Sequence, residues 1–596
     1  MSVLDRIERL RNAMEQQKVD CYIIPTDDYH HSEYVGDYFK FREYITGFTG
    51  SAGTAVFTKD KAGLWTDGRY FIQAETQLQG SGITLYKSGE PGVPTIEEFL
   101  KSELKEGDVL GFDGRTVTYA QGKRYCHIAD ENGASLKYSL DFAQNIWKER
   151  PEMSMESVFS LEDEYTGEKI GSKLERIREI MKENGCNAHV LSSLDDIAWL
   201  LNIRGNDIAY CPLVLSYTIV YNNSVELFAD IRKFSDDIVN SLAENQVKIY
   251  PYEDIYHKVS EMTSEDKLLL DSAIMNYSLY QAISKETVIV DKQNPEILMK
   301  SVKNETQAEN LRKAHLKDAV AHTKFMYWLK KNIGRVEITE LSASARLEGL
   351  RAEQEHFLGP SFGPISAYGE HGAIVHYSAD EKSNVPLKEG KLFMTDTGGH
   401  YLEGSTDITR TVALGEVGNL EKEHFTLVAR AMLRLANTVF LYGCSGANLD
   451  CIAREIFWKE GLNFNHGTGH GVGYLLNIHE GPINFRWKEG ERPAPALEEN
   501  MVITDEPGIY IEGSHGIRLE NELLVRKTVK NEYGQFMNFE ILTYVPIDLD
   551  AILPEKMSTE EKEMLNHYHK QVYEKVSPYL SEEERIWLKE YTRAVK

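Results

Sequence analysis

The chain has 596 residues, 42% of them apolar, and carries 66 basic against 93 acidic side chains, for a formal net charge of −27. This length predicts several domains, at ~150 residues each, with well-buried cores. The acidic excess argues against a nucleic-acid or anionic-membrane partner, because phosphate binding requires clustered Lys and Arg.

The first 20 residues predict a packed amphipathic helix rather than a targeting segment. Leu4, Ile7, Leu10 and Met14 recur at helical spacing among charged residues. The segment lacks the apolar region of a secretory signal, and no uninterrupted apolar run of about 18 residues occurs in the chain. The six cysteines are scattered without a CxxC pair, which fits a reducing compartment. We therefore expect a cytoplasmic protein with no membrane partner.

The first half of the chain repeats one pattern of segments. Residues 11–57 contain a charged helix, a short strand, an Asp-Asp pair and the apolar strand GFTGSAGTAVF. Residues 178–221 contain the same series and end in the apolar strand PLVLSYTIVY. The same series of segments in the same order favours a duplication, so we expect two related α/β domains.

A third region begins near residue 301. Residues 305–333 predict one long helix with Ala321, Phe325, Trp328 and Leu329 on its apolar face and Gly334 as its stop. Strand-like segments rich in Gly, His, Asp and Glu follow up to about residue 548. Two capping-box patterns, at residues 558–561 and 581–584, predict two helices in the tail.

Acidic residues lie inside or next to apolar, strand-like segments of this third region. Asp396 and Asp407 flank Gly398-Gly399-His400-Tyr401, which we interpret as a turn of a hairpin. Glu506 and Glu520 flank a second turn at residues 514–516. Burying an ionised carboxylate requires a counter-charge, and Arg410 and Arg518 are the obvious local cations.

Two divalent cations would balance four such carboxylates. Four carboxylates and one His suit Mn²⁺, with Co²⁺, Fe²⁺ or Zn²⁺ as alternatives. Carboxylates that bridge two metals hold them about 3.5–4 Å apart, as in two-metal hydrolases. Spacing alone does not show that these residues converge.

The stretch His466-Gly467-Thr468-Gly469-His470-Gly471-Val472-Gly473 places two imidazoles four residues apart among four glycines. Gly costs about 1 kcal/mol per interior helix position, so a strand or tight loop is favoured over a helix. Gly there lets a backbone or a ligand approach closely. Histidine serves both as a metal ligand and as an acid or base, and the residues leave both roles open.

In this order, Asp396 and Asp407, the His-Gly-Thr-Gly-His-Gly-Val-Gly stretch, Thr-Asp-Glu-Pro-Gly and Ile-Arg-Leu-Glu-Asn resemble the pita-bread metallopeptidases. That family includes methionine aminopeptidase, prolidase, creatinase and the Xaa-Pro aminopeptidases. The resemblance extends over nearly the whole chain and is strongest to the three-domain cytosolic Xaa-Pro aminopeptidases. It implies two creatinase-like α/β domains, at residues 1–152 and 153–300, and a catalytic pita-bread domain with a helical tail at 301–596.

The resemblance also implies the site residues. The ligands of two divalent metals, Mn²⁺ being expected, would be Asp396, Asp407, His470, Glu506 and Glu520. The residues that face the substrate would be His376, His466, His479 and Arg518. Glu506 would in addition shuttle a proton, so the expected catalytic set is His376, His466, His479 and Glu506.

The implied function is removal of the N-terminal residue from peptides with proline second, by a hydroxide that bridges the two metals. Prolidase activity on X-Pro dipeptides is the enzymatic alternative, although prolidase chains usually lack the duplicated middle domain. A catalytically inactive peptide-binding protein is the alternative of another class, although such proteins typically lose ligands. The partners implied are peptide substrates and a second copy of the chain in a homodimer.

Overall fold

The structure is a computed structural model that describes residues 1–488, 490 and 493–596. The chain forms two compact units. The first contains residues 1–161 and 168–296, and the second contains residues 162–167 and 297–596. None of the helices in the described residues is long and apolar enough to cross a membrane.

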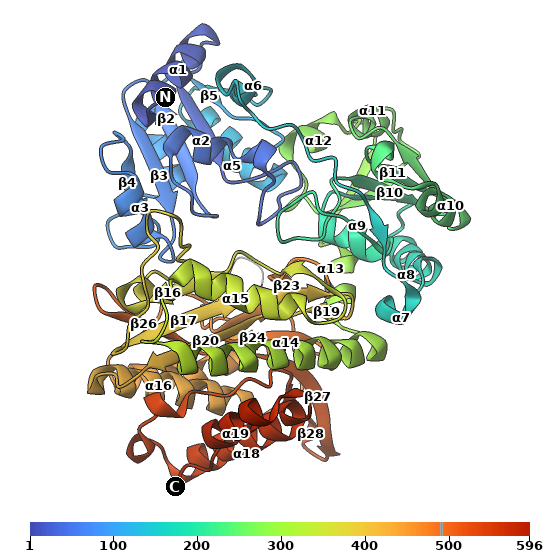
Figure 1. Cartoon of the computed structure of the whole chain (residues 1–596). Coiled ribbons are helices and arrows are strands. Elements are labelled where there is room, and N and C mark those ends of the chain that lie inside the picture. The colour runs from blue at the N-terminus through green and yellow to red at the C-terminus, as the bar shows by residue number, and fades with distance from the viewer. Residues whose placement is uncertain (489, 491–492) are drawn as a thin grey trace. The chain divides into compact units, whose positions relative to one another are not determined.

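The first unit contains two six-stranded sheets (blue and green in Figure 1). In spatial order, the first sheet is β4 (Thr84–Lys87), β3 (Ala62–Thr66), β2 (Thr54–Thr58), β1 (Cys21–Pro25), β5 (Val109–Gly111) and β6 (Ser135–Lys137). The second sheet is β12 (Val247–Tyr250), β11 (Val225–Phe228), β10 (Tyr217–Tyr221), β8 (Ala188–Leu191), β13 (Lys267–Leu270) and β14 (Val288–Asp291).

The two sheets have the same topology. In the first, β1 pairs antiparallel with β2 and parallel with β5. In the second, β8 pairs antiparallel with β10 and parallel with β13. The flanking pairs also agree, because β3–β4 and β11–β12 are both parallel. The matching order and direction of every strand support the duplication predicted from the sequence.

Both faces of the first sheet are covered. Along β1, Cys21 and Ile23 enter one hydrophobic core while Tyr22 and Ile24 enter another. This alternation follows from the two-residue period of a strand, and it explains why β1 is apolar on both of its faces. The helices of the unit are α1 (Val3–Gln16), α2 (Phe41–Thr46), α3 (Phe71–Gln77), α4 (Ile96–Glu103), α5 (Tyr119–Glu131), α6 (Phe142–Ile146), α8 (Ile170–Glu183), α9 (Leu194–Leu200), α10 (Asp236–Glu244), α11 (Asp254–Ser260) and α12 (Tyr277–Ala282).

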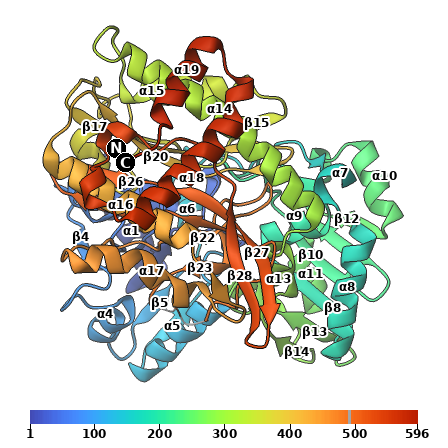
Figure 2. The same ribbon diagram turned by 90° about the horizontal axis from the view of Figure 1, so that it is seen from below.

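The second unit is built around two larger sheets, which carry the acidic segments. One has the order β16 (Ile365–Tyr368), β17 (Lys391–Thr397), β20 (Ile408–Leu414). The other has the order β21 (Phe440–Leu441), β28 (Gly534–Ile541), β27 (Asn521–Asn531), β24 (Val502–Asp505), β22 (Gly469–Gly471), β23 (Glu480–Phe485). Figure 2 shows β27 and β28 as a long hairpin. The smaller sheets contain β15 (Phe357–Pro360), β18 (Gly399–Tyr401) and β19 (Gly404–Ser405), and β25 (Gly508–Ile511) with β26 (His515–Arg518).

Helices enclose these sheets. The predicted long helix is α14 (Glu305–Asn332), capped by Asn304 and followed by Gly334 at φ 72°. It packs against α15 (Glu340–Ala352) and against the tail helices α18 (Thr559–Val576) and α19 (Glu582–Tyr591). Both tail helices begin with the predicted capping boxes. Helices α16 (Asn419–Ala436) and α17 (Gly446–Lys459) pack against each other.

Several local predictions need correction. Leu4 is 57% exposed, so only Ile7, Leu10 and Met14 of the predicted helix face enter the core. The expected strand GFTGSAGTAVF, residues 47–57, begins only at Thr54. Gly47 ends helix α2 in the left-handed conformation, and residues 48–53 belong to no helix or strand. β17 and β20 do pair as a hairpin, but Gly399–Tyr401 between them is strand β18 rather than a turn.

Candidate active site

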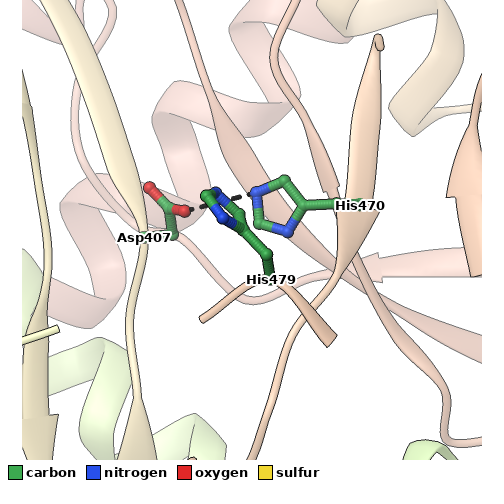
Figure 3. Close-up of side chains that lie close together, drawn as sticks. All are labelled: Asp407, His470 and His479. Atoms are coloured by element: carbon green, nitrogen blue, oxygen red, sulfur yellow. Dashed lines mark ion pairs between the residues drawn. The ribbon is translucent and has the colours of Figure 1, made fainter. Parts of the chain in front are cut away.

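Four carboxylates and two histidines converge in the second unit. The potential ligand atoms of Asp396, Asp407 and Glu520 lie within 4.8 Å of one another. The same limit holds for His470, Glu506 and Glu520, and for Asp407, His470 and His479. Figure 3 shows the His470 imidazole directed at the Asp407 carboxylate with the His479 ring beside them. The five residues expected as ligands are therefore brought into one overlapping cluster.

Each of the four acids lies at or next to the end of a strand. Asp396 is on β17 and Asp407 immediately precedes β20, its pairing partner. Glu506 immediately follows β24, and Glu520 lies between β26 and β27. Arg518 is the last residue of β26, so Arg518 and Glu520 do not lie on one continuous strand.

Without bound cations, burial makes the ionised form of this carboxylate cluster energetically unfavourable. Burial raises the pKa of Asp407 well above its usual range, and the neighbouring Asp396 carboxylate raises it further. Burial and then Asp407 do the same to the pKa of Glu520. Oδ1 of Asp396 is buried and has no hydrogen-bond partner among the described residues. A buried, oxygen-rich donor set with one imidazole fits hard-to-borderline divalent cations.

Protein cations do not neutralise the cluster. Arg518 donates to Oδ2 of Asp396 from Nε at 3.1 Å and also from Nη2. Arg410, the other expected counter-charge, instead donates to the carbonyls of Val545 and Glu520 and to the side chain of Asn521. One guanidinium therefore pairs with only one of the four acids. Bound metals would supply the positive charge that the cluster still lacks.

Hydrogen bonds orient the candidate ligands. Nδ1 of His470 donates to the carbonyl of Gly471 at 2.9 Å, which leaves Nε2 as the lone-pair nitrogen. That Nε2 lies 3.5 Å from Asp407 and 3.7 Å from Glu506. Thr409 donates to Oε2 of Glu520 at 2.8 Å. The backbone N–H of Asp407 donates to Glu522 at 2.7 Å.

The two histidines of the glycine-rich stretch differ. Nδ1 of His466 lies 2.7 Å from the carbonyl of Gly467 and its Nε2 lies 2.8 Å from the Tyr510 hydroxyl. His466 belongs to none of the potential ligand groups that the described residues form. The Tyr510 hydroxyl also accepts from Nη1 of Arg518 at 2.7 Å, which connects His466 to the Arg518–Asp396 pair. Sequence reasoning missed Tyr510, although it lies only four residues beyond Glu506.

The remaining expected residues, His479 and His376, differ in their relation to the potential ligand groups. The His479 ring meets that of His470 edge-on, at 4.3 Å between centroids, so geometry alone makes it a potential ligand as well as a substrate-facing group. His376 is half-buried and lies outside the potential ligand groups. The carbonyl of its neighbour Val375 accepts from Arg518 at 3.3 Å. Arg518 thus contacts Asp396, Tyr510 and Val375.

The glycines around His470 allow the protein's own strands to approach. A Cβ on Gly469 would lie 1.8 Å from the carbonyl oxygen of Thr504, and a Cβ on Gly471 would lie 2.2 Å from that of Glu480. A Cβ on Gly473 would lie 2.3 Å from the carbonyl oxygen of Asn477. Of the two explanations left open by the sequence, close backbone packing accounts for these three glycines.

Comparisons with known proteins cover the whole chain. The creatinase/prolidase N-terminal domain matches residues 6–137 and 149–307, metallopeptidase family M24 matches 309–527, and the C-terminal region of peptidase M24 matches 535–595. Xaa-Pro aminopeptidase 1 of Dictyostelium discoideum is 36% identical over 97% of this chain and 94% of that protein. Aminopeptidase P1 of Arabidopsis thaliana is 34% identical over 99% of each.

A solved structure agrees as closely. X-prolyl aminopeptidase of Caenorhabditis elegans, described as a cytosolic enzyme with a di-nuclear active site, superposes with a TM-score of 0.95 at 33% identity over 100% of both chains. These matches confirm the expected fold class of two creatinase-like α/β domains followed by a pita-bread catalytic domain.

Proposed function

The chain belongs to metallopeptidase family M24, and we propose that it is an Xaa-Pro aminopeptidase that removes the N-terminal residue from peptides with proline in the second position. The observation that carries the proposal is the convergence of four carboxylates and His470 in one buried cluster. Retention of all five argues against a catalytically inactive binding protein. The full-length similarity to Xaa-Pro aminopeptidases favours this activity over that of prolidase.

The residues present fit two divalent cations. We assign Asp396, Asp407, His470, Glu506 and Glu520 as the ligands, with Mn²⁺ as the metal. Once bound, the cations would supply Lewis acidity and lower the pKa of a bound water by several units. The oxygen-rich donor set favours Mn²⁺ over softer ions.

The side chains around the cluster would handle protons and the substrate. Glu506, whose carboxylate lies 3.7 Å from Nε2 of His470, would accept a proton and deliver it to the leaving proline nitrogen. His376 and His479 would donate hydrogen bonds to the oxyanion that develops on the scissile carbonyl. His466 would face the substrate, and Arg518 would hold Asp396 in place beside it.

An X-Pro bond is a tertiary amide without an N–H. The pocket must therefore select it by the shape of the ring rather than by a hydrogen bond to that nitrogen.

The decisive experiment compares a tripeptide and a dipeptide, both with proline second, on protein loaded with Mn²⁺ after chelation. We expect cleavage of the tripeptide at the X-Pro bond. Cleavage of the dipeptide alone would assign prolidase activity instead. Failure to cleave either peptide, with two metals bound per chain, would favour the inactive peptide-binding protein.

We further propose a cytoplasmic homodimer with domains at residues 1–152, 153–300 and 301–596. Trp458 and Trp487 support an interface, because both are more than 40% exposed and their rings lie 5.7 Å apart. Exposed, clustered aromatic side chains mark association surfaces. Light scattering on Trp458→Glu should report a monomer where the unmodified protein gives a dimer.

A further inference from the structure

The segment that carries His376 has little regular structure of its own. A short 3-10 helix, η3 (Gly369–Ala373), is followed by an irregular stretch that contains Val375, His376 and Tyr377. An irregular segment holds a side chain in one place only if other elements fix it. The residues that fix this segment are therefore part of how His376 acts.

Glu340 fixes it from one side. This first residue of α15 is completely buried, and its carboxylate accepts four hydrogen bonds. Oε1 accepts from the Tyr368 N–H at 2.8 Å and from Nδ1 of His371 at 2.8 Å. Oε2 accepts from the Tyr377 hydroxyl at 2.9 Å and from the Val385 N–H at 3.4 Å. The donors come from before, within and after the segment, so one carboxylate gathers it into a single loop.

Glu340 lies among hydrogen-bond donors at the first residue of a helix. The N-terminus of α15 favours a carboxylate. His371 lies between Glu340, Glu370 and Lys391, and its hydrogen bond to Glu340 is the main reason that its pKa is raised. The His371 ring also stacks on that of Tyr377, at 4.5 Å between centroids. His371 and Tyr377 thus reach the same carboxylate as a packed pair.

Strand β26 fixes the loop from the other side. The backbones of Gly372 and Gly516 are so close that a Cβ on Gly516 would lie 1.6 Å from the carbonyl oxygen of Gly372. Two residues further along β26, Arg518 donates to the carbonyl of Val375 at 3.3 Å while it holds Asp396. The loop is therefore stretched between Glu340 and a guanidinium bound to a candidate metal ligand. Figure 1 labels α15, β16, β17 and β26 in the second unit.

We propose that Glu340 and Tyr377 are positioning residues that hold His376 at the dinuclear site, acting through the loop 369–377. We assign neither residue a contact with the substrate. This inference rests on the proposed function to the extent that His376 acts on the scissile bond. A displacement of about 1 Å in a catalytic group costs about a hundredfold in rate, so loosening this loop should be visible in turnover.

The first test uses Tyr377→Phe, which deletes a single hydroxyl, and Glu340→Gln, which keeps the shape of the side chain. With two metals still bound per chain, we expect kcat/KM on an X-Pro tripeptide to fall by about tenfold to a hundredfold. Tyr327→Phe is the matched control, because its hydroxyl also donates to a carboxylate, that of Glu583, at 2.8 Å on the surface. Glu348→Gln, exposed on the same helix as Glu340, controls for the lost charge.

A double-mutant cycle separates positioning from general destabilisation. In a His376→Ala background, Tyr377→Phe should cost less than about twofold, because the side chain that it positions is gone. If the losses of kcat/KM in the two single variants instead multiply in the double variant, Tyr377 does not act through His376 and the proposal fails.

Hydrogen exchange of the amides in residues 369–377 provides a readout that needs no peptidase activity. Exchange there should be faster in Tyr377→Phe than in the unmodified protein and unchanged in Tyr327→Phe. Equal exchange in all three would overturn the proposal. A different outcome separates the two proposals. If the unmodified protein is inactive but Tyr377→Phe still exchanges faster than it does, the proposed function is refuted and the role of Glu340 and Tyr377 stands.

Discussion

Replacing Asp407 by Asn should stabilise the metal-free protein while it destroys metal binding. The ligand atoms of Asp396, Asp407 and Glu520 lie within 4.8 Å of one another. At an effective dielectric constant of about 20, two carboxylates at that distance repel by about 3.5 kcal/mol. Burial and mutual repulsion raise the pKa of Asp407 and of Glu520, so proton uptake relieves part of this energy. We expect the neutral amide to recover about 2 kcal/mol of the free energy of unfolding.

The assay is thermal unfolding in EDTA and in excess Mn²⁺. In EDTA the Asp407→Asn protein should melt about 4 °C above the unmodified protein, at roughly 2 °C per kcal/mol for a domain of this size. In Mn²⁺ the order should reverse, because a metal at 100 times its Kd adds about 2.7 kcal/mol per site to a protein that binds it. Turnover of an X-Pro tripeptide should be lost in Asp407→Asn, as in Asp407→Ala. Glu416→Gln removes one exposed charge from the same unit and should change neither result.

Two outcomes would refute the reasoning. A lower melting temperature for Asp407→Asn in EDTA would mean that the four acids do not repel one another in the folded protein. Equal protection of both proteins by Mn²⁺ would mean that Asp407 is not a ligand. Activity in the Asp407→Ala protein would refute the dinuclear site as a whole.

Three further predictions concern other residues of the second unit. Lys303→Met should lower the free energy of unfolding by about 3 kcal/mol, because it removes the ammonium that pairs with the buried Glu480 carboxylate, and calorimetry should show Glu480→Gln restoring part of the loss. His479→Ala should lower kcat/KM by about a hundredfold while metal analysis still finds two ions per chain; one ion per chain would make His479 a ligand. Burial lowers the pKa of His569 to about 3, so its neutral form stabilises the fold above about pH 6.5 and that contribution is lost as the pH falls. Between pH 6 and pH 4, the free energy of unfolding measured with urea should therefore fall by about 1.4 kcal/mol less per pH unit in His569→Gln than in the unmodified protein.

Short-range patterns in the sequence predicted much of the secondary structure. The long helix over 305–332 follows from apolar periodicity and the Gly334 stop, and the tail helices follow from two capping boxes, because these signals act within one or two helical turns. The strand lengths were less predictable, because the Gly-rich residues before Thr54 were counted as part of the strand that begins there. Only the pairing partner decides where a strand begins.

The sequence by itself determined the chemical types of the candidate ligands and their order along the chain. Carboxylates in apolar surroundings require a counter-charge wherever they fold. The tertiary structure decided which residues meet, since Asp396 and Glu520 are far apart in sequence and approach only through the pairing and packing of β17, β20, β26 and β27. It also decided that Arg410 bonds to backbone carbonyls while Arg518 holds Asp396, and that Glu340 gathers the His376 loop. Side-chain partners across such distances depend on how whole strands pack, which residue spacing does not record.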